Sequence, residues 1–320
     1  MANFKFIEVN VSEQGFRLDR FLLRYFSSIP YSLLQKKIRL GYFKVNGKKK
    51  RPSYKIIFQD KITYIDNIEI NKKVKKNKVI EKKKIETIKN SIIFEDKHIL
   101  ILNKPYGIAV QGGTKISFSI DDALPFLSSS TDNLRLTHRI DKNTTGLLLI
   151  AKSREIAKNV AKLFKEGNIK KIYWALVLGA PKKITDNINI SIAKVSKGGV
   201  EKMEIAKDNK NVALTHYKTL ETKSGLSLLE VLPKTGKTHQ IRIHMLLKKI
   251  PILGDKKYKL LDKNEKFANT LYKMHLHSKS IRFNLLNKKY IFDAELPQHF
   301  KQTLLEKRFK ILKNKNAKGN

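Results

Sequence analysis

The densest group of polar side chains runs from Thr137 to Gly146, directly before the apolar run Leu147–Ala151. Asp141 lies at its centre, and a loop that leads into a buried strand can hold a reactive side chain rigidly. An ionised carboxylate held there could stabilise positive charge, attack an electrophilic carbon or accept a proton. An Asp among Asn and Thr is also a common turn or cap residue, so this segment alone leaves both interpretations open.

Histidines are the other side chains that could do chemistry, and around a metal ion they would indicate a metal-dependent hydrolase: His138, His239, His244, His275 and His277. His239 and His244 are five residues apart, so they do not stack on one helical face, and no Glu joins them in a zincin pattern. His275 and His277 would share one side of a strand, but such a pair is more often structural. We expect no metal site, and the hydrolase remains the weaker alternative. The sequence also lacks a nucleotide-binding glycine fingerprint or a P-loop, so no cofactor is expected.

The charge balance of the chain is strongly positive. Its 320 residues include 67 Lys and Arg against 28 Asp and Glu, which gives a net charge of +39. Such a field suits a polyanion, and nucleic acid is the expected partner. An anionic membrane surface is the alternative, but it usually requires an amphipathic helix with exposed apolar residues, and we find none.

Cysteine is absent, which excludes disulfides, thiolate metal sites and a cysteine nucleophile and suits a reducing compartment. The first residues do not resemble a signal peptide, and no run of apolar residues is long enough to cross a membrane. We therefore expect a cytoplasmic protein that does not associate with membranes.

A lysine-rich segment divides the chain. Between Asn71 and Lys84 there are eight Lys and one Glu, with no Gly or Pro, and charge repulsion predicts an extended, solvated linker. This linker, 71–84, separates an N-terminal domain at 1–70 from a larger domain at 85–310. A basic tail, 311–320, follows.

The N-terminal part reads as two helices followed by a hairpin. Apolar residues recur at helical spacing from Leu18 to Phe26, and a second short helix is predicted from Ser32 to Gly41. Asn46-Gly47 then predicts a tight hairpin turn. The segment predicts a cationic face beside a small core, formed by Arg20, Arg24, Lys36, Lys37, Arg39, Lys44, Lys48, Lys49, Lys50 and Arg51.

The second part alternates strands and helices without the regular period of a doubly wound sheet. Strands are predicted at 91–94, 99–102, 172–178, 226–232 and 280–283. One helix should run from the Ser153 cap to Gly167, and another should follow Thr238 and end before Pro251. This pattern indicates an α+β fold with a large mixed, mostly antiparallel sheet flanked by helices.

The segment His138-Arg-Ile-Asp-Lys-Asn-Thr-Thr-Gly-Leu-Leu-Leu149 closely resembles the catalytic signature of the RluA family of pseudouridine synthases. The resemblance implies that Asp141 is the essential catalytic residue. It also implies that Arg139 holds the flipped nucleotide or fills the position that this nucleotide leaves in the base stack. Ile140 stands where Leu is usual and Thr145 where Ser is usual, and both are mild changes.

Further segments resemble the same family in the expected order. Leu102-Asn-Lys-Pro-Tyr-Gly107 is similar to its entry turn, which we interpret as structural. Lys171-Ile-Tyr173 resembles the motif whose tyrosine lies against the target uracil. Thr235–His244 resembles the segment whose arginine pairs with the aspartate, which assigns that role to Arg242. Lys237 stands where the family often has Arg. The positive charge is kept, but the paired N–H donors of a guanidinium are lost.

Two resemblances concern the RNA target. Val110–Gly113, with Ser117-Phe-Ser119 after it, is most similar to the branch that acts on large-subunit ribosomal RNA, although Gln111 replaces a usual histidine. The N-terminal part resembles an S4 RNA-binding domain through Arg17–Leu22, Lys37–Gly41 and Val45–Gly47. S4 domains bind structured RNA largely through phosphates and shape.

Together these resemblances imply a monomeric enzyme that isomerises uridine to pseudouridine in structured RNA, and the branch that the chain resembles implies large-subunit ribosomal RNA. Asp141 would act at the ribose C1′, and Arg242 would keep it ionised and fix its rotamer. Tyr173 would form a wall of the pocket and could accept the C5 proton. A non-catalytic RNA-binding or ribosome-assembly protein with the same fold is the alternative from a different class.

Overall fold

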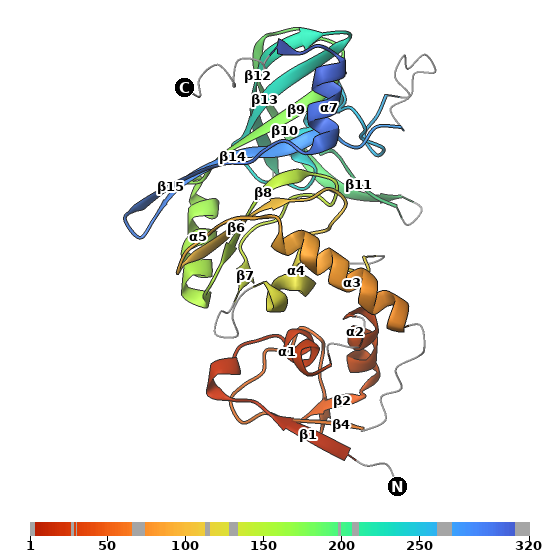
Figure 1. Ribbon diagram of the computed structural model, residues 1–320, viewed down its shortest axis with the longest axis vertical. Helices are drawn as coiled ribbons and strands as arrows, with labels where there is room; N and C mark the ends of the chain where they lie inside the picture. The colour runs from red at the N-terminus through yellow and green to blue at the C-terminus, as the bar shows by residue number, and fades with distance from the viewer. Residues whose placement is uncertain are drawn as a thin grey trace. The chain divides into compact units, whose positions relative to one another are not determined.

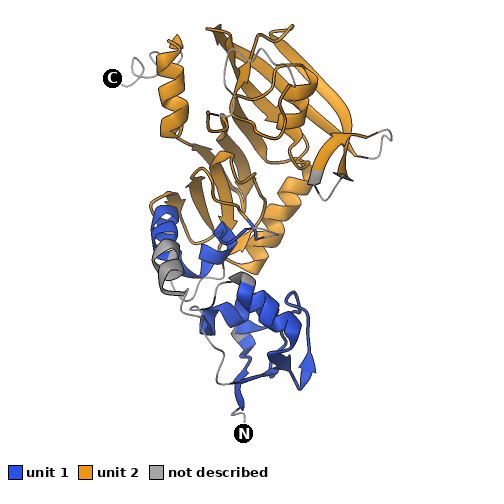
Figure 2. Cartoon of the chain, turned by 90° about the vertical axis from the view of Figure 1, so that its right-hand side faces the viewer, with its two compact units in different colours: residues 1–89, 111–130 blue, residues 90–110, 131–320 orange. Residues whose placement is uncertain are grey.

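The computed structural model describes residues 4–26, 29, 31–65, 74–112, 116–127, 134–197, 200–206, 211–260 and 271–310. The chain forms two compact units (Figure 2). The N-terminal unit contains residues 1–89 and 111–130, and the C-terminal unit contains residues 90–110 and 131–320.

The N-terminal unit combines a small sheet with short helices. Its strands β1 (Phe4–Glu8), β4 (Lys61–Ile65), β2 (Phe43–Val45) and β3 (Lys48–Lys49) lie in that order. The helical elements are η1 (Val11–Glu13), α1 (Leu18–Tyr25), α2 (Tyr31–Leu40), α3 (Val74–Lys89), α4 (Ile120–Ala123) and η2 (Leu124–Phe126). Phe21 of α1 and Ile38 of α2 join Phe43 and Ile62 of the sheet in one buried cluster, so the predicted helix, helix and hairpin are confirmed.

The lysine-rich segment is helical where the structure describes it, and the prediction of an extended linker is wrong there. Helix α3 runs from Val74 to Lys89 and covers most of the predicted linker. Lys and Glu are good helix formers, and the segment has neither Gly nor Pro to end a helix. Charge repulsion between lysines weakens a helix by only a few tenths of a kcal/mol per pair, about the same size as the propensity gain.

The division of the chain also differs from the one predicted. Residues 111–130 were expected in the larger domain, but they belong to the N-terminal unit. The physical reason is an ion pair cluster, in which the Arg20 guanidinium of α1 donates to Asp121 and Asp122 of α4. Lys84 of α3 also places its ammonium over the Phe118 ring.

The C-terminal unit is built on one large sheet, which confirms the predicted fold class (Figure 1). Its strands lie in the order β11-β10-β12-β13-β9-β14-β8-β6-β5, with β15 beside β14 and β7 beside β8. Among the described pairs only β14 and β8 are parallel. The bounds are β5 (Ile92–Glu95), β6 (Ile99–Lys104), β7 (Arg135–Leu136), β8 (Thr145–Ala151), β9 (Lys170–Leu178), β10 (Thr185–Lys197), β11 (Val200–Ile205), β12 (Val212–Lys223), β13 (Leu226–Pro233), β14 (Leu276–Leu285) and β15 (Lys288–Asp293).

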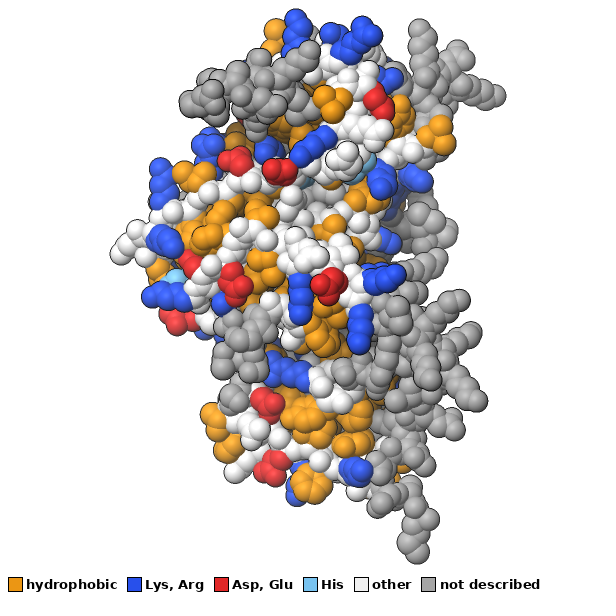
Figure 3. Space-filling view, in the orientation of Figure 1, with side chains coloured by type: hydrophobic (Ala, Val, Ile, Leu, Met, Phe, Trp, Pro, Cys, Tyr) orange, Lys and Arg blue, Asp and Glu red, His pale blue; other side chains and the backbone are white. Residues whose placement is uncertain are grey.

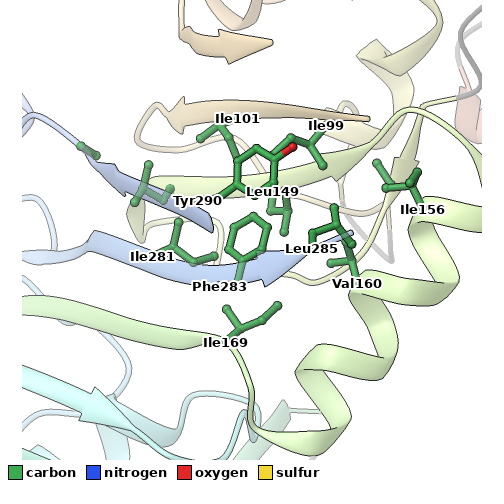
Figure 4. Close-up of a cluster of buried hydrophobic side chains, with 13 residues drawn as sticks. Ile99, Ile101, Leu149, Ile156, Val160, Ile169, Ile281, Phe283, Leu285 and Tyr290 are labelled. Atoms are coloured by element: carbon green, nitrogen blue, oxygen red, sulfur yellow. The ribbon is translucent and has the colours of Figure 1, made fainter. Parts of the chain in front are cut away.

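Three helices accompany this sheet: α5 (Arg154–Glu166), α6 (Gln240–Leu247) and α7 (Gln298–Glu306). The predicted caps of α5 are present, since the Ser153 hydroxyl accepts from the Ile156 N–H and Gly167 ends the helix with φ +75°. Ile156 and Val160 of α5 pack against a core that includes Leu149 and Phe283 of the sheet (Figure 4). This packing holds β8 firmly, directly after the Asp141 loop. No helix within the described ranges is long and apolar enough to span a membrane.

Candidate active site

The loop that carries Asp141 is tied down on both sides. The Thr144 N–H donates to the Asp141 carbonyl at 3.1 Å, and the Gly107 N–H donates to the Lys142 carbonyl at 3.1 Å. Thr145 is buried at the start of β8, where its hydroxyl lies 2.8 Å from His277 Nδ1. The Asp141 backbone is thereby positioned by two neighbouring segments of the sheet.

Gly146 allows this loop to approach β14. Its φ of +100° is in a region that L side chains rarely adopt. A Cβ at this position would overlap the backbone of Ser278, which is its register partner on β14. Ser278 is also the register partner of Tyr173 on β9, so β14 sets the spacing between the strands of Asp141 and Tyr173.

Arg242 connects the loop to α6, 101 residues further along the chain. Its Nη1 donates to Asp141 Oδ2 at 2.9 Å. Its Nε and Nη2 donate to the two carboxylate oxygens of Asp255 at 2.7 and 2.8 Å. Asp255 is buried and also accepts the backbone N–H groups of Lys257 and Tyr258. A bidentate pair of this kind fixes the plane of a guanidinium, so Asp255 orients Arg242 toward Asp141.

The charge of Arg242 is secured by its two partners. Burial disfavours the charged guanidinium, but the hydrogen bonds and negative charge of Asp255, together with those of Asp141, outweigh burial and raise the pKa of Arg242. The Tyr258 ring also lies 4.9 Å from the guanidinium carbon. Arg242 is therefore cationic at neutral pH.

The turn before α6 is held by Gln240. Its Oε1 accepts from the Thr235 hydroxyl at 2.7 Å and from the Lys237 N–H at 3.0 Å. Its amide group donates to the Leu214 carbonyl and to the Thr215 hydroxyl of β12. These bonds anchor the first turn of α6 to the sheet, and Arg242, two residues after Gln240, lies in that same turn and reaches Asp141.

Tyr173 lies in β9 at the same site and is almost completely buried. Burial, with the nearby negative charge of Asp141, raises the pKa of Tyr173 to about 12 despite an opposing hydrogen bond from Ser278. The phenol is therefore protonated at neutral pH. To accept the C5 proton the phenol would first have to lose its own, and the raised pKa makes that loss more costly, while the ring lines the cavity in either state.

These three side chains face one cavity of about 740 Å³, which is within the usual range for a ligand pocket. Cationic side chains dominate its lining: Arg139, Lys165, Lys171, Lys234, Lys237 and Arg242, against Asp141 and Glu166. Phe164, Ile140 and Leu276 add apolar walls. A pocket with aromatic and apolar walls and a majority of cations among its charged side chains suits a nucleotide, whose phosphates need cations and whose base needs flat contacts.

The other predicted RNA-binding residues divide into three groups. Arg139 and Lys237 are exposed and line the cavity. Most of those in the N-terminal unit are exposed or half-buried on its surface: Arg24, Lys37, Arg39, Lys44 and Lys48. Arg20 differs, because its guanidinium is largely buried in the ion pairs with Asp121 and Asp122. The structure gives Arg20 an internal partner, and the remaining RNA contacts stay predictions.

Lys104 was interpreted as part of a structural turn, and its contacts agree. It is fully buried, and its ammonium donates to the carbonyls of Pro105, Ile108 and Lys142 at 2.9 to 3.1 Å. Burial lowers the pKa of Lys104 to about 7, while the charge of Asp141 acts in the opposite direction. Three carbonyl acceptors match the three hydrogens of an ammonium group, so Lys104 binds the entry turn to the Asp141 loop.

The sequence analysis did not single out Asp255, and it considered His239 only as a possible metal ligand. Asp255 orients Arg242, and His239 places its Nε2 3.7 Å from Asp141 Oδ2. The available signal for Asp255 was the glycine before it, because Gly254 has φ +79° and a Cβ there would overlap the backbone of Lys273. In the sequence this signal is only a Gly-Asp pair, which is common in turns, so it did not single out Asp255.

The histidines do not gather around one point. His138 Nε2 accepts from the Leu149 N–H, His277 bonds Thr145, and His275 bonds the Lys273 carbonyl and the Thr303 hydroxyl. In the part of the chain that the structure describes, no three His, Cys, Asp or Glu side chains are grouped as metal ligands. The arrangement gives each of these three histidines a structural hydrogen bond instead.

Three of these histidines predict that the protein loses stability in acid. His244, His275 and His277 are buried, and burial lowers their pKa values to about 4, 4 and 3. In the unfolded chain each histidine has a pKa of about 6.5. At pH values between the folded and unfolded pKa values, the unfolded state binds more protons than the folded state. The contribution of these neutral histidines to the free energy of unfolding is therefore complete above about pH 6.5 and is lost as the pH falls through about 4.

Each of the three groups should contribute up to about 1.4 kcal/mol per pH unit in this window. Urea unfolding at about pH 7.5 and about pH 5 should therefore give a free energy of unfolding lower by several kcal/mol at the acidic value. The variant His277→Gln should have a shallower dependence. Equal unfolding free energies at the two pH values would contradict neutral buried histidines.

Comparisons with known proteins agree on one family. Residues 98–247 match the family described as RNA pseudouridylate synthase. The chain is 36% identical over 292 residues to the protein of Rickettsia bellii named Ribosomal large subunit pseudouridine synthase C, covering 89% of this chain and 95% of that protein. It is 33% identical over 286 residues to the protein of the same name from Haemophilus influenzae, covering 88% of each.

Solved structures give the same result for the fold. The structure titled Human RNA Pseudouridylate Synthase Domain Containing 4 is 27% identical and superposes with a TM-score of 0.61. That match covers 72% of this chain and 98% of the human one. A second human structure, titled RNA Pseudouridylate Synthase Domain Containing 1, has a TM-score of 0.55 at 22% identity and shows the fold alone.

Proposed function

The chain belongs to the RNA pseudouridylate synthase family, and from this premise we propose that it converts uridine to pseudouridine in large-subunit ribosomal RNA. The observation that carries the proposal is the Asp141 carboxylate, which Arg242 holds at 2.9 Å in a cation-lined cavity. The names of its bacterial relatives support the ribosomal target. We further propose that the protein acts as a monomer in the cytoplasm, where this RNA is found.

The proposed reaction breaks the C1′–N1 bond of uridine, turns the uracil and joins C1′ to C5. The sugar carbon becomes positively charged as the base leaves, and Asp141 is the group placed to meet that charge. Asp141 could instead form a covalent bond to C1′ or remove the C2′ proton. Both of these routes also require an ionised and oriented carboxylate. When C1′–C5 forms, C5 releases its proton and N1 gains one, so the reaction is an isomerisation without an oxidant or a transferred group.

Access to C1′ requires the uridine to leave its stack, at a cost of roughly a few kcal/mol. Tyr173, with its protonated phenol, would lie against the extruded uracil. Arg139 is exposed at the cavity and would occupy the vacated stack or hold the flipped nucleotide. Lys171 and Lys237, which line the same cavity, would contact the phosphates on either side.

The N-terminal unit would position the RNA. Its helices α1 and α2 carry the S4-like segments, and Arg24, Lys37 and Arg39 are cations on that unit. We propose that these residues bind structured RNA through phosphates and shape, while the C-terminal unit performs the chemistry.

The proposal is tested by mapping pseudouridines in ribosomal RNA from cells with and without this protein. One or more large-subunit sites should be lost, and the unaltered protein should restore them. Purified protein should also release tritium from ribosomal RNA labelled at uridine C5, because that hydrogen leaves in the reaction. If no site is lost and no tritium is released, the protein is a binding protein without this activity.

A further inference from the structure

The small sheet of the N-terminal unit has one face that its helices do not cover. The covered face carries Phe43, Val45 and Ile62, which are buried in the core with α1 and α2. Side chains alternate between the faces of a strand, and register partners share a face. The open sheet face is therefore formed by Phe4, Phe6, Glu8, Lys44, Lys49, Lys61, Thr63 and Ile65.

Two aromatic rings are exposed on this face. Phe4 is 65% exposed and Phe6 is 57% exposed, both on the edge strand β1. Burying a Phe side chain stabilises a protein by roughly 2 kcal/mol, and an exposed ring does not provide this free energy. A solvent-exposed strand position could be occupied by a polar residue that favours strands, such as Thr. Figure 3 shows hydrophobic side chains at the surface of the N-terminal unit with Lys and Arg among them. Two neighbouring exposed rings on one face mark an interaction surface.

Lysines lie on the same face as these rings. Lys61 places its ammonium 4.6 Å from the centre of the Phe6 ring. Lys44 is the register partner of both Thr63 and Lys49, which continues the positive charge across the face. Glu8, the register partner of Lys61, is the one acid among these eight residues. An apolar partner or a second copy of the chain that covered this face would have to bury these lysines, and pairing through the other edge strand, β3, would bring lysines together.

We propose that the open sheet face binds unpaired nucleotides of the RNA substrate, with bases stacked on Phe4 and Phe6 and phosphates at Lys44, Lys49 and Lys61. Residues two apart on a strand are separated by about 6.8 Å, which allows one base on each ring. A sheet that presents aromatic rings and cations in this way is a physically suitable platform for single strands. The inference rests on the proposed function, because it supplies a second RNA contact to the same enzyme.

The test uses the full chain and two fluorescein-labelled probes, an oligouridylate of about 12 nucleotides and a blunt RNA duplex of the same length. The double variant Phe4→Ala/Phe6→Ala should lower the affinity for oligouridylate about 100-fold, ten-fold for each ring, and leave duplex affinity unchanged. The matched control is Val11→Ala, since Val11 is 68% exposed in the same unit but lies outside the sheet. That control should bind both probes as the unaltered protein does.

A direct readout of stacking comes from Phe6→Trp. The only tryptophan of the chain, Trp174, is buried, so the new indole would be the exposed fluorophore. Oligouridylate should quench its emission, and Lys61→Gln should weaken that binding.

Unchanged affinity of the double variant for oligouridylate would overturn the inference, as would an equal loss with both probes. If the double variant and the unaltered protein differed in molecular mass in sedimentation, the face would mediate a contact between protein chains instead. Tritium release by the unaltered protein is measured in the same preparation, so a failure of the proposed activity is recognised separately.

Discussion

Replacing Asp141 with asparagine should lower the rate of pseudouridine formation by about 10⁴-fold or more, because a reacting group of an active site is lost. Asparagine keeps the shape of the side chain and can still accept the hydrogen bond from Arg242 Nη1. It cannot carry the negative charge that stabilises or attacks C1′. The fold and the cationic lining of the cavity should remain, and RNA affinity should change little.

The measurement is single-turnover tritium release, together with RNA affinity by filter binding. Asp186→Asn is the control, because Asp186 forms a surface ion pair with Lys248 at 2.6 Å on β10 of the same unit. That variant should retain full activity. Comparable rates for Asp141→Asn and Asp186→Asn would reject Asp141 as the catalytic carboxylate.

Replacing Asp255 with asparagine should destabilise the protein by about 3–5 kcal/mol, the usual cost of removing one partner of a buried ion pair. The Asp255 side chain is fully buried and accepts both Nε and Nη2 of Arg242. An amide group in its place would direct N–H hydrogens at the guanidinium. Arg242 would then lose the bond that sets its plane, and kcat should fall while KM changes little, because Asp255 is a positioning residue.

Urea unfolding and steady-state kinetics together separate these effects. Asp255→Asn should lower both the unfolding free energy and kcat, and Asp255→Glu should recover part of kcat by restoring the charge. Asp186→Asn again serves as the control, since an exposed pair is worth about 0–1 kcal/mol. If Asp255→Asn had the unfolding free energy of Asp186→Asn, the Arg242–Asp255 pair would not be a structural element of the site.

The local parts of the site could be predicted because they depend on neighbouring residues. The Asp141 loop precedes the apolar run of β8, and that polar-to-apolar change is visible in the sequence. The Ser153 and Gly167 caps of α5 act within one turn of the chain, so their residue types are sufficient. Strand β12 was not predicted, because polar residues such as Thr215 occupy some of its buried positions, whereas the alternating Ile188 and Ile190 of β10 were a signal that the prediction did not use.

Other features depend on residues that are distant in the chain. Arg20 was predicted to contact RNA, but its partners Asp121 and Asp122 lie about a hundred positions away and no local pattern indicates them. The lysines of 74–84 were read as a repelling linker, and helix propensity prevailed in α3. The pKa of Tyr173 also depends on the fold, since burial beside Asp141 raises it to about 12.

The amino-acid sequence by itself identified the family, because the order of residues around Asp141, Tyr173 and Arg242 resembles its motifs, and it indicated Asp141 as the carboxylate that we propose to be catalytic. The tertiary structure decided the electrostatics, since only the folded sheet brings Arg242 to 2.9 Å from Asp141 and buries Asp255 behind it. Residue types are properties of the chain, whereas distance and burial, which control charge interactions, are properties of the fold.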